Sequence, residues 1–441
     1  MRKIVLLVSM FAIAANMMAA DHVMAATKHA PKQEVPATLN LSLQEAQDYA
    51  VAQNRSLKNA DLAVQKAYAT RWQTIASMLP SVDMSWAYQS MMGYKMNFGG
   101  MPIEMPDNGT LGITASVGIN GQAIVGALLN NTAIEMQKLN LEISEDNLRA
   151  SVKSSYASVL VLEDVVKLLD SSLKNIENLA AMTQRSVEVG AAEQTTADQI
   201  LVRVNTLKNN INANKRSTQL AINALKVLLN VPAETELTLT TQLSDMLSAE
   251  AIVALLGKDF VLENNLSYQT LAKNVELAKK NVHMAGWAYG PTIGVGYQYS
   301  EKDYFGKKEG FNMTPPNALS IQVSMPLWSS GKRAAGVVEK KIALEEARNT
   351  FEETADNLGI QNEQLRYNLQ NAYETYTNEQ ENMGVTQRVF DNTSLKFQQG
   401  VASNLDLVNA SNDLITAQST YVQAVLTLVN AEVELEKFLN L

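Results

Sequence analysis

The spacing of apolar residues along the chain changes twice from a helical period to a period of two. Between 81 and 120, apolar residues occupy every second position on either side of a glycine- and proline-rich loop, 95–110. The same alternation returns between 292 and 325, on either side of a charged loop, 301–316. Alternation of this kind predicts strands with one apolar and one small or polar face, so we expect a β-hairpin in each region.

Each expected hairpin is preceded by a helical stretch. The first opening helix follows a capping box formed by Ser42 and Glu45 and is stopped by Pro80, whose ring cannot continue a helix. The second opening helix, at about 266–289, is stopped by Gly290-Pro291. The two hairpins therefore begin after equivalent signals.

The longest helical stretches follow the hairpins, over 122–187 and 332–398. In the first of them the apolar residues recur in alternating steps of four and three, which is the heptad pattern of helices that supercoil against neighbours. At 1.5 Å per residue this helix would be about 100 Å long. In the second, Gly359 and Gly384 are expected to loosen the helix.

Two glycine turns interrupt the helical pattern, at Gly190 and at Gly400. Glycine readily takes the left-handed conformation that ends a helix, and Ser403 is placed to cap the helix that follows the second turn. The order of helix, hairpin, long helix, glycine turn and helix thus occurs twice, which predicts a tandem duplication. Its expected parts are a first repeat, 41–231, a connector, 232–250, and a second repeat, 251–441.

The N-terminus has the order of a secretory signal peptide, with Arg2-Lys3 before an apolar run and then small residues. We expect a signal peptide over 1–26, cleaved near 20–26, and an N-terminal extension over 27–40. Loss of Arg2, Lys3 and Asp21 removes a net charge of +1, so the formal charge changes from −9 to −10. An acidic chain is a poor partner for nucleic acid, and the sequence contains no cysteine for disulfides.

Several short motifs, which follow the family's order and are spread over both repeats, resemble the TolC family of bacterial outer-membrane efflux proteins. They are Leu43-Gln-Glu-Ala46, Asn54, Leu79-Pro80, Met325-Pro326-Leu327-Trp328-Ser-Ser-Gly331 and the turns at Gly190 and Gly400. Each motif alone is weak, but the duplicated order is specific, and the resemblance covers nearly all of the chain after the signal.

The resemblance implies a mixed α+β membrane protein that assembles as a homotrimer. Three protomers would give four strands each to one twelve-stranded β-barrel in the outer membrane, which a long α-helical barrel would continue into the periplasm. The implied function is a passive exit duct of a tripartite efflux or type I secretion system, for small molecules or polypeptides. Its implied partners are a periplasmic adaptor, an inner-membrane transporter and outer-membrane lipid.

The resemblance also implies a gate at the periplasmic end, carried by Asp406 and, one turn further on, Asn409. Asp406 matches the position at which family members carry carboxylates that face the pore axis. The residues allow a second interpretation, in which Ser403 and Asp406 form a capping box. Thr195 and Asp198 offer the same local pattern in the first repeat, and the two roles of Asp406 are compatible.

Two further sets of site residues are expected. The adaptor should dock at the exposed turns, which are Val189, Gly190, Ala191, Gln399, Gly400 and Val401. The apolar faces of the strands should contact lipid through Trp86, Tyr88, Val117, Val295, Tyr297 and Val323, while Ser85, Ser116, Gln298 and Gln322 should line the lumen.

No residue pattern in the sequence indicates an enzyme. There is no glycine-rich phosphate loop and no nucleophile with a matching base, and we expect neither a cofactor nor a metal site. Two alternatives to the exit duct stay open at this point. A periplasmic helical adaptor or scaffold would explain the helices without a membrane, and a substrate-specific porin would explain the hairpins without the long helices.

Overall fold

The computed structural model describes residues 37–104, 106–190, 192–305 and 315–441, so the expected signal peptide lies outside the described residues. The described chain divides into two units. The first, the strand unit, contains Asp61–Leu139 and Thr270–Glu352. The second, the hairpin unit, contains the described residues up to Ala60, together with Asn140–Gln269 and Glu353–Leu441.

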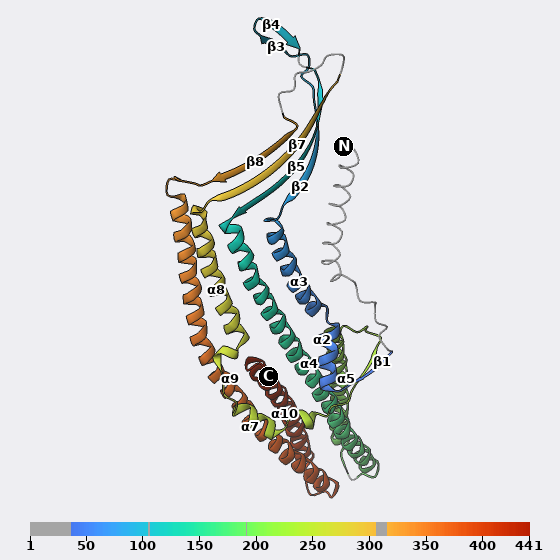
Figure 1. Ribbon diagram of the computed structural model, residues 1–441. Helices are drawn as coiled ribbons and strands as arrows, with labels where there is room; N and C mark the ends of the chain where they lie inside the picture. The colour runs from blue at the N-terminus through green and yellow to red at the C-terminus, as the bar shows by residue number, and fades with distance from the viewer. Residues whose placement is uncertain (1–36, 105, 191, 306–314) are drawn as a thin grey trace. The chain divides into compact units, whose positions relative to one another are not determined.

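A four-stranded antiparallel sheet of order β2-β5-β7-β8 is the centre of the strand unit (Figure 1). Its strands are β2 (Ser81–Gln89), β5 (Asn108–Asn120), β7 (Thr292–Tyr304) and β8 (Asn317–Ser324). Each of the two predicted hairpins supplies two neighbouring strands, and β5 pairs with β7 in the middle. Within the described residues, β2 and β8 are therefore the edges of this sheet.

The register decides which residues share a face, because cross-strand partners stand on the same side of a sheet. Val82 pairs with Ala115, Ala115 with Tyr297, and Tyr297 with Leu319. The apolar positions of all four strands therefore lie on one face. Small and polar residues, such as Ser116 in the row Ser81, Ser116, Gly296 and Ser320, lie on the other.

The segment expected as the loop 95–110 contains a ribbon of two short strands. These are β3 (Lys95–Phe98) and β4 (Met101–Glu104), which pair in antiparallel fashion beyond the end of the sheet (Figure 1). Gly99 and Gly100, with φ of 57° and 90°, form the tip. Two consecutive left-handed residues suit a tight hairpin turn, so the expectation of a loop throughout is wrong here.

Long helices join the sheet to the rest of the chain. They are α3 (Arg55–Ala76), α4 (Gly121–Glu188), α8 (Leu266–Gly286), which continues as the 3-10 turn η3 (Trp287–Tyr289), and α9 (Lys332–Gln398). α9 passes through Gly359 and Gly384 without a break, and a loosening of the helix at these glycines stays a prediction. Among the described helices, none combines the length and the apolar character that a membrane span requires.

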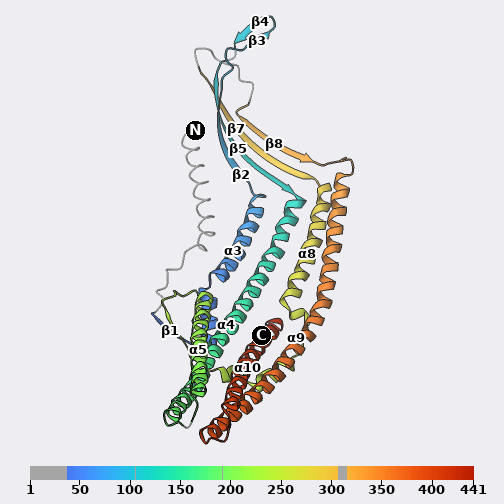
Figure 2. The ribbon, with the colours of Figure 1, turned by 180° about the vertical axis from the view of Figure 1, so that it is seen from behind.

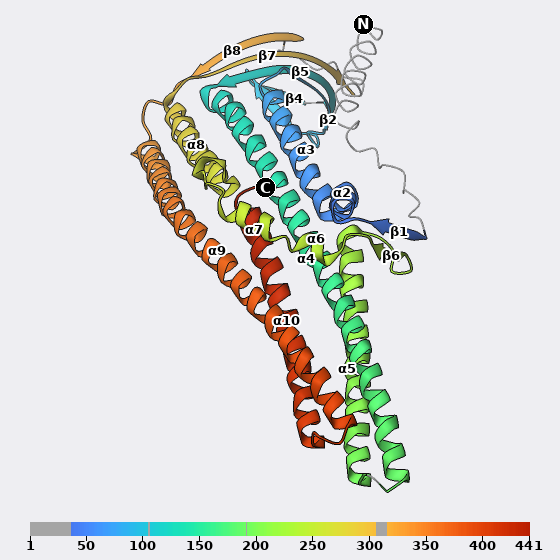
Figure 3. The same cartoon turned by 90° about the horizontal axis from the view of Figure 1, so that it is seen from below.

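Two helical hairpins dominate the hairpin unit. α4 turns back as α5 (Gln194–Leu229), and α9 turns back as α10 (Asn404–Phe438), as Figures 2 and 3 show from two directions. Both hairpins contribute to one buried apolar cluster. Its members include Leu169, Ile176, Leu179, Ile200, Val204, Leu207, Ile211, Phe390, Leu407, Ala410 and Leu414.

The first opening helix is interrupted, contrary to the single helix expected. α2 (Leu43–Gln53), which begins with the predicted capping box, ends at Asn54, and α3 starts immediately afterwards. The Asn54 side chain accepts a hydrogen bond from the N–H of Ser56 at 2.8 Å and donates one to the carbonyl of Leu228 at 2.9 Å. Asn54 therefore caps the N-terminus of α3 and also connects it to the end of α5.

The same pair of hydrogen bonds, which we call the asparagine clasp, recurs at the start of α8. Asn265 accepts a hydrogen bond from the N–H of Ser267 at 3.0 Å and donates one to the carbonyl of Phe438 at 3.1 Å. Asn265 stands 211 residues after Asn54, and Phe438 stands 210 residues after Leu228. Equivalent asparagines thus fasten the end of the last helix to the opening helix in each half of the chain.

Short elements occupy the segment around the expected extension, the expected connector and the start of the expected second repeat. They are β1 (Thr38–Leu41), β6 (Glu236–Leu239), α6 (Leu243–Met246), α7 (Ala249–Leu256) and the 3-10 turn η2 (Leu262–Asn264). β1 and β6 pair in parallel. The buried Tyr156 of α4 donates its hydroxyl to the carbonyl of Leu41 and accepts the N–H of Thr241, both at 3.0 Å, which fixes both strands against the helix.

Candidate functional site

The six residues predicted to contact lipid all lie on the apolar face of the sheet. The register places Trp86 and Tyr88 of β2, Val117 of β5, Val295 and Tyr297 of β7 and Val323 of β8 on this side. Ser85, Ser116, Gln298 and Gln322 lie on the opposite face. The separation agrees with the alternation in the sequence, whereas contact with lipid stays a prediction.

Polar groups end the apolar face at the side remote from the helices. The Tyr88 hydroxyl donates to the carboxylate of Asp107 at 2.9 Å, and the Tyr299 hydroxyl donates to that of Glu301 at 3.0 Å. Glu301 and Asp303 follow on the same face of β7, because they pair with Leu111 and Gly109. The rings of Tyr88 and Phe305 lie 5.8 Å apart at this level.

At the other end of the sheet, Trp287 is seated against backbone. A Cβ atom added to Gly121, the first residue of α4, would lie 2.1 Å from the Trp287 indole, and one added to Gly290 would lie 2.9 Å from it. The indole therefore packs closely against two glycines while half of its surface stays exposed. The sequence analysis did not single out Trp287, although it stands three residues before Gly290.

Gly121→Ala is expected to lower the free energy of unfolding by about 1 to 3 kcal/mol, because the stiff indole of Trp287 must leave its seat. The measurement is guanidinium unfolding of the protein reconstituted in lipid vesicles. Gly118→Ala is the matched control, since a Cβ at Gly118 of β5 would meet no atom within 4 Å. Equal stability of the two variants would contradict the close packing of Trp287 against Gly121.

The two glycine turns have the predicted left-handed backbone, with φ of 71° at Gly190 and 73° at Gly400. At the second turn the N–H of Gly400 bonds the carbonyl of Phe397 at 3.0 Å, and that of Val401 bonds the carbonyl of Lys396 at 2.9 Å. This pair of bonds is the Schellman arrangement, which satisfies the last carbonyls of α9.

Apolar side chains are exposed at the tips of both turns. Val189 is 79% exposed and Val401 is 74% exposed, and Gln399 is exposed beside it. Ala191, the remaining residue of the predicted docking set, lies outside the described residues. Exposed valines at the ends of two helical hairpins suit a surface that another protein covers.

Asp406 takes part in the capping box that the sequence allowed. Its N–H donates to Ser403 Oγ at 3.1 Å, while its carboxylate accepts the Ser403 N–H at 2.9 Å and the Ser403 hydroxyl at 2.7 Å. These hydrogen bonds from the Ser403 hydroxyl and backbone lower the pKa of Asp406. Asp406 and Asn409 are exposed, whereas Leu407 and Ala410 are buried among the helical hairpins.

The equivalent capping pattern in the first repeat is absent, so that expectation is wrong. Glu193 precedes the first residue of α5, and its side chain makes no capping hydrogen bond. Thr195 donates to Glu193 at 3.2 Å instead, and Asp198 accepts from Gln194 at 2.8 Å. The two glycine turns therefore differ in how the following helix begins.

A charged cluster that the sequence analysis missed joins α4 to α10. Lys153 Nζ lies 2.8 Å from Glu432 Oε1 and 2.7 Å from Glu436 Oε2, and the side chains of Lys153 and Glu432 are 13% and 7% exposed. The second oxygen of Glu432 is buried without a hydrogen-bond partner. Burial raises the pKa of Glu432. The neighbouring carboxylate of Glu436 adds to this rise, whereas the ammonium of Lys153 acts against it.

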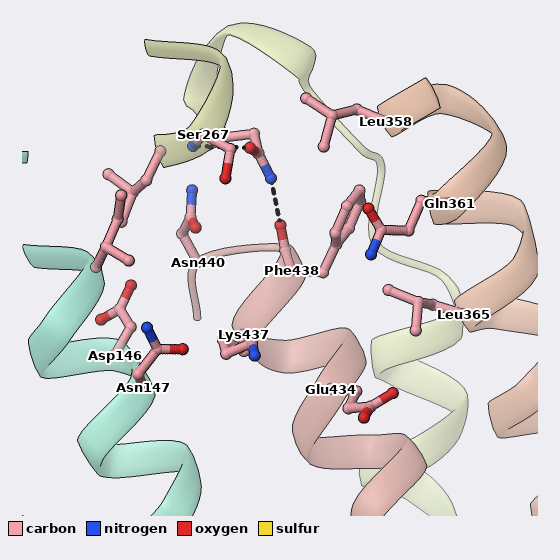
Figure 4. A pocket seen from close by; sticks show the side chains of 13 residues that line it. Asp146, Asn147, Ser267, Leu358, Gln361, Leu365, Glu434, Lys437, Phe438 and Asn440 are labelled. Atoms are coloured by element: carbon pink, nitrogen blue, oxygen red, sulfur yellow. Dashed lines mark hydrogen bonds between the residues drawn. The ribbon is translucent and has the colours of Figure 1, made fainter. Parts of the chain in front are cut away.

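A pocket of about 410 Å³ lies beside the second asparagine clasp, where α4, α8, α9 and α10 meet (Figure 4). Its lining includes Asp146, Glu434 and Lys437, and burial raises the pKa of Asp146. The lining has no histidine. In the described part of the chain, no three histidine, aspartate or glutamate residues are placed to hold a metal ion.

Comparison with known proteins gives one consistent result. The family model described as outer membrane efflux protein matches residues 47–231 and 259–441. The probable efflux pump outer membrane protein TtgC of Pseudomonas putida is 23% identical over 427 residues, which cover 90% of this chain and 83% of TtgC. The outer membrane efflux protein BepC of Brucella suis is 23% identical over 301 residues, or 66% of this chain and 63% of BepC.

Solved structures share the fold. The chain is similar to CusC, with a TM-score of 0.76 and 16% identity over 93% of this chain and 98% of CusC. It is also similar to the outer membrane protein VceC of Vibrio cholerae, with a TM-score of 0.73 and 15% identity over 90% of this chain and 95% of VceC.

Proposed function

Because the chain belongs to the outer membrane efflux protein family, we propose that three copies of it form one exit duct of a tripartite efflux or type I secretion system. The protein is an outer-membrane channel with a helical part in the periplasm, and it is not an enzyme. Channels of this kind work as oligomers with an adaptor and an inner-membrane pump. The periplasmic scaffold considered from the sequence is thereby disfavoured.

The four-stranded sheet supports the trimer. One protomer has an apolar face that nothing in the described structure covers with a second sheet, and it has open edges at β2 and β8. When sheets join side by side in a membrane, their edge strands become paired and their apolar faces are covered by lipid. Three sheets of four strands give an even, twelve-stranded barrel with an apolar outside and a small, polar inside.

The repeated asparagine clasps support the tandem duplication. Asn54 and Asn265 make the same two kinds of hydrogen bond with partners that follow at almost equal distances along the chain. The family model also matches two separate stretches of similar length. We propose that each repeat supplies one hairpin to the barrel and one helical hairpin to the periplasmic cylinder.

The barrel is tested by placing lysine on each face of one strand. Ile321→Lys, on the apolar face of β8, is expected to cost about 2 to 4 kcal/mol of folding free energy in vesicles, because it puts a charge in lipid. Gln322→Lys, one residue away on the opposite face, should cost much less. Both values come from guanidinium titration of the reconstituted protein, and equal costs would count against the barrel.

The proposed docking surface is the pair of turn tips at Val189-Gly190-Ala191 and Gln399-Gly400-Val401. A double Val189→Asp and Val401→Asp variant should lose cross-linking to the adaptor and lose export, since exposed apolar anchors become charged. Trimer yield should be unchanged, because neither valine is buried. Val227→Asp, at an exposed valine on α5 near its far end, is the control. Export by the double variant at the parent's rate would contradict docking at the tips.

We further propose that Asp406 and Asn409 from three protomers surround the pore at its periplasmic end. Their exposure, next to the buried Leu407 and Ala410, leaves them free to face an axis that lies outside the protomer. The conducting path would then be narrowest at one ring of carboxylates and one ring of amides.

A further inference from the structure

The pocket beside the second asparagine clasp is built entirely from one unit of the chain. Its cavity of about 410 Å³ falls within the range of small-molecule sites, which is roughly 300 to 1,000 Å³. All of its lining residues belong to the hairpin unit, and they come from α4, from α9 and from the adjoining ends of α8 and α10. A ligand bound here would therefore contact helices of both repeats.

The walls of the pocket are fixed by contacts that leave the cavity open. Asn265 holds the end of α10 through the carbonyl of Phe438, at 3.1 Å. The side chain of Asn440 donates to the carbonyl of Asn264. The Phe438 ring is stacked on Phe260, with 5.0 Å between the ring centroids. The cavity is thus preformed, so a ligand does not have to order its walls.

One side of the pocket is apolar and the other is polar. Figure 4 shows Leu358, Leu365 and Phe438, all of them buried, on one side of the cavity. Asp146 and Asn147 of α4 lie on the other side. An apolar wall with a few polar groups is the usual form of a small-molecule site, in which the polar groups fix the orientation of the ligand.

The lining of the pocket has a net negative charge. It contains the carboxylates of Asp146 and Glu434 and a single ammonium, that of Lys437. In the part of the chain that the structure describes, none of these three side chains forms an ion pair. Lys437 is exposed, so its ammonium can turn toward solvent. A ligand with one positive charge would neutralise the lining.

Asp146 is the carboxylate of the lining that is partly buried. Its burial and the neighbouring carboxylates of Glu142 and Glu145 raise its pKa. The charge of Arg149 acts against this rise, but Arg149 is already engaged by Asp48 at 2.9 Å and by Glu145 at 3.0 Å. A carboxylate in this setting is stabilised by a further positive charge, because an opposite charge favours its ionised form.

We propose that this pocket binds a small organic cation, whose apolar body lies against Leu358, Leu365 and Phe438 and whose positive charge lies beside Asp146. The bound ligand contacts α4, α8, α9 and α10 together, so it favours the arrangement in which these four helices meet. The pocket lies within the hairpin unit of one chain. The inference therefore rests on neither the proposed barrel nor the proposed gate.

Ethidium, a planar aromatic cation whose emission rises when it leaves water, is the probe. It is titrated into the full-length protein in phosphatidylcholine vesicles, and every sample carries Asp406→Asn so that the proposed carboxylate ring does not contribute. One ethidium should bind per chain. Asp146→Asn should weaken binding at least about tenfold, because it removes the paired charge and keeps the shape. Asp164→Asn, at an exposed aspartate of the same helix, is the matched control and should bind like the parent.

Two further variants separate the charge of the pocket from its volume. Lys437→Met should strengthen the binding of ethidium, because it removes a like charge from the lining. Ser267→Trp should abolish binding, since Ser267 is exposed at the pocket and an indole there fills the cavity. Its backbone N–H can still donate to Asn265, so the fold and the yield of protein should be unchanged.

Three results would overturn the inference. The first is a parent that takes up no ethidium, which would mean that the cavity is covered or closed in the assembled protein. The second is equal binding by Asp146→Asn and the parent. The third is binding of anilinonaphthalene sulfonate, an aromatic anion, as tightly as ethidium, because the cavity would then select apolar surface and not positive charge.

Discussion

Replacing Lys153 with methionine is expected to lower the free energy of unfolding by about 3 to 5 kcal/mol at neutral pH. The ammonium is the shared partner of Glu432 and Glu436, at 2.8 Å and 2.7 Å. Its loss leaves two carboxylates facing each other, one of them buried, with no positive charge between them. Burial acts to lower the pKa of Lys153, but the two carboxylates outweigh it, so the ammonium stays charged.

Lys167→Met in the same helix is the control. Lys167 lies 2.8 Å from Asp164, but both side chains are exposed to solvent. An exposed pair contributes less than about 1 kcal/mol, so this variant should be close to the parent. Guanidinium unfolding of both variants in vesicles makes the comparison. Similar values for the two variants would show that the buried cluster adds little to stability.

The cost of Lys153→Met should also depend on pH. The pKa of Glu432 is raised in the folded protein above its ordinary value of 4.5. Because of this raised pKa, the folded state binds the proton at a higher pH than the unfolded state does. Glu432 therefore stabilises the folded state at pH values below its ordinary pKa, and this contribution is lost as the pH rises through the pKa of the folded state. Lowering the pH through this window should therefore reduce the loss caused by Lys153→Met.

Local patterns in the sequence were enough to predict the strands of the sheet and the turns between the long helices. Alternation places Val82 and Ser81 on opposite faces whatever their partners are, because the period of a strand is two. Gly190 and Gly400 identify helix ends because few other residues take the left-handed backbone. The ribbon at Gly99-Gly100 carries an equally local signal, a tight-turn dipeptide, which the sequence analysis read as part of a loop.

Contacts between distant parts of the chain could not be predicted in the same way. Lys153 contacts Glu432, which lies 279 residues later in the sequence. No pattern near either residue predicts this contact. Asn54 was noted only as part of a family motif, because its role depends on the carbonyl of Leu228. Four residues of β1 are too few to give a period, and they become a strand only beside β6.

Asp406, the proposed gate residue, shows both what a local sequence pattern can predict and what it cannot. The capping box of Ser403 and Asp406 is a local motif and is present as predicted. A pore constriction is a property of three chains and stays a prediction. The two roles have opposite electrostatic consequences, because the cap lowers the pKa of Asp406, whereas three like carboxylates near one axis would raise it. A substitution that keeps the cap and removes the charge separates them.

Asp406→Asn is such a substitution, since an amide oxygen can still accept the hydrogen bonds of Ser403. The parent trimer in a planar bilayer is expected to prefer cations, to show low conductance and to be blocked by added divalent or trivalent cations, because three carboxylates converge at the entrance. Asp406→Asn should abolish the block with trimer assembly intact, and Asp198→Asn, in the corresponding turn of the first repeat, should be blocked like the parent. Asp406→Ala loses the cap as well, at about 1 kcal/mol, and should be unblocked too. If Asp406→Asn is blocked as strongly as the parent, Asp406 only caps α10, and the constriction is formed by other residues.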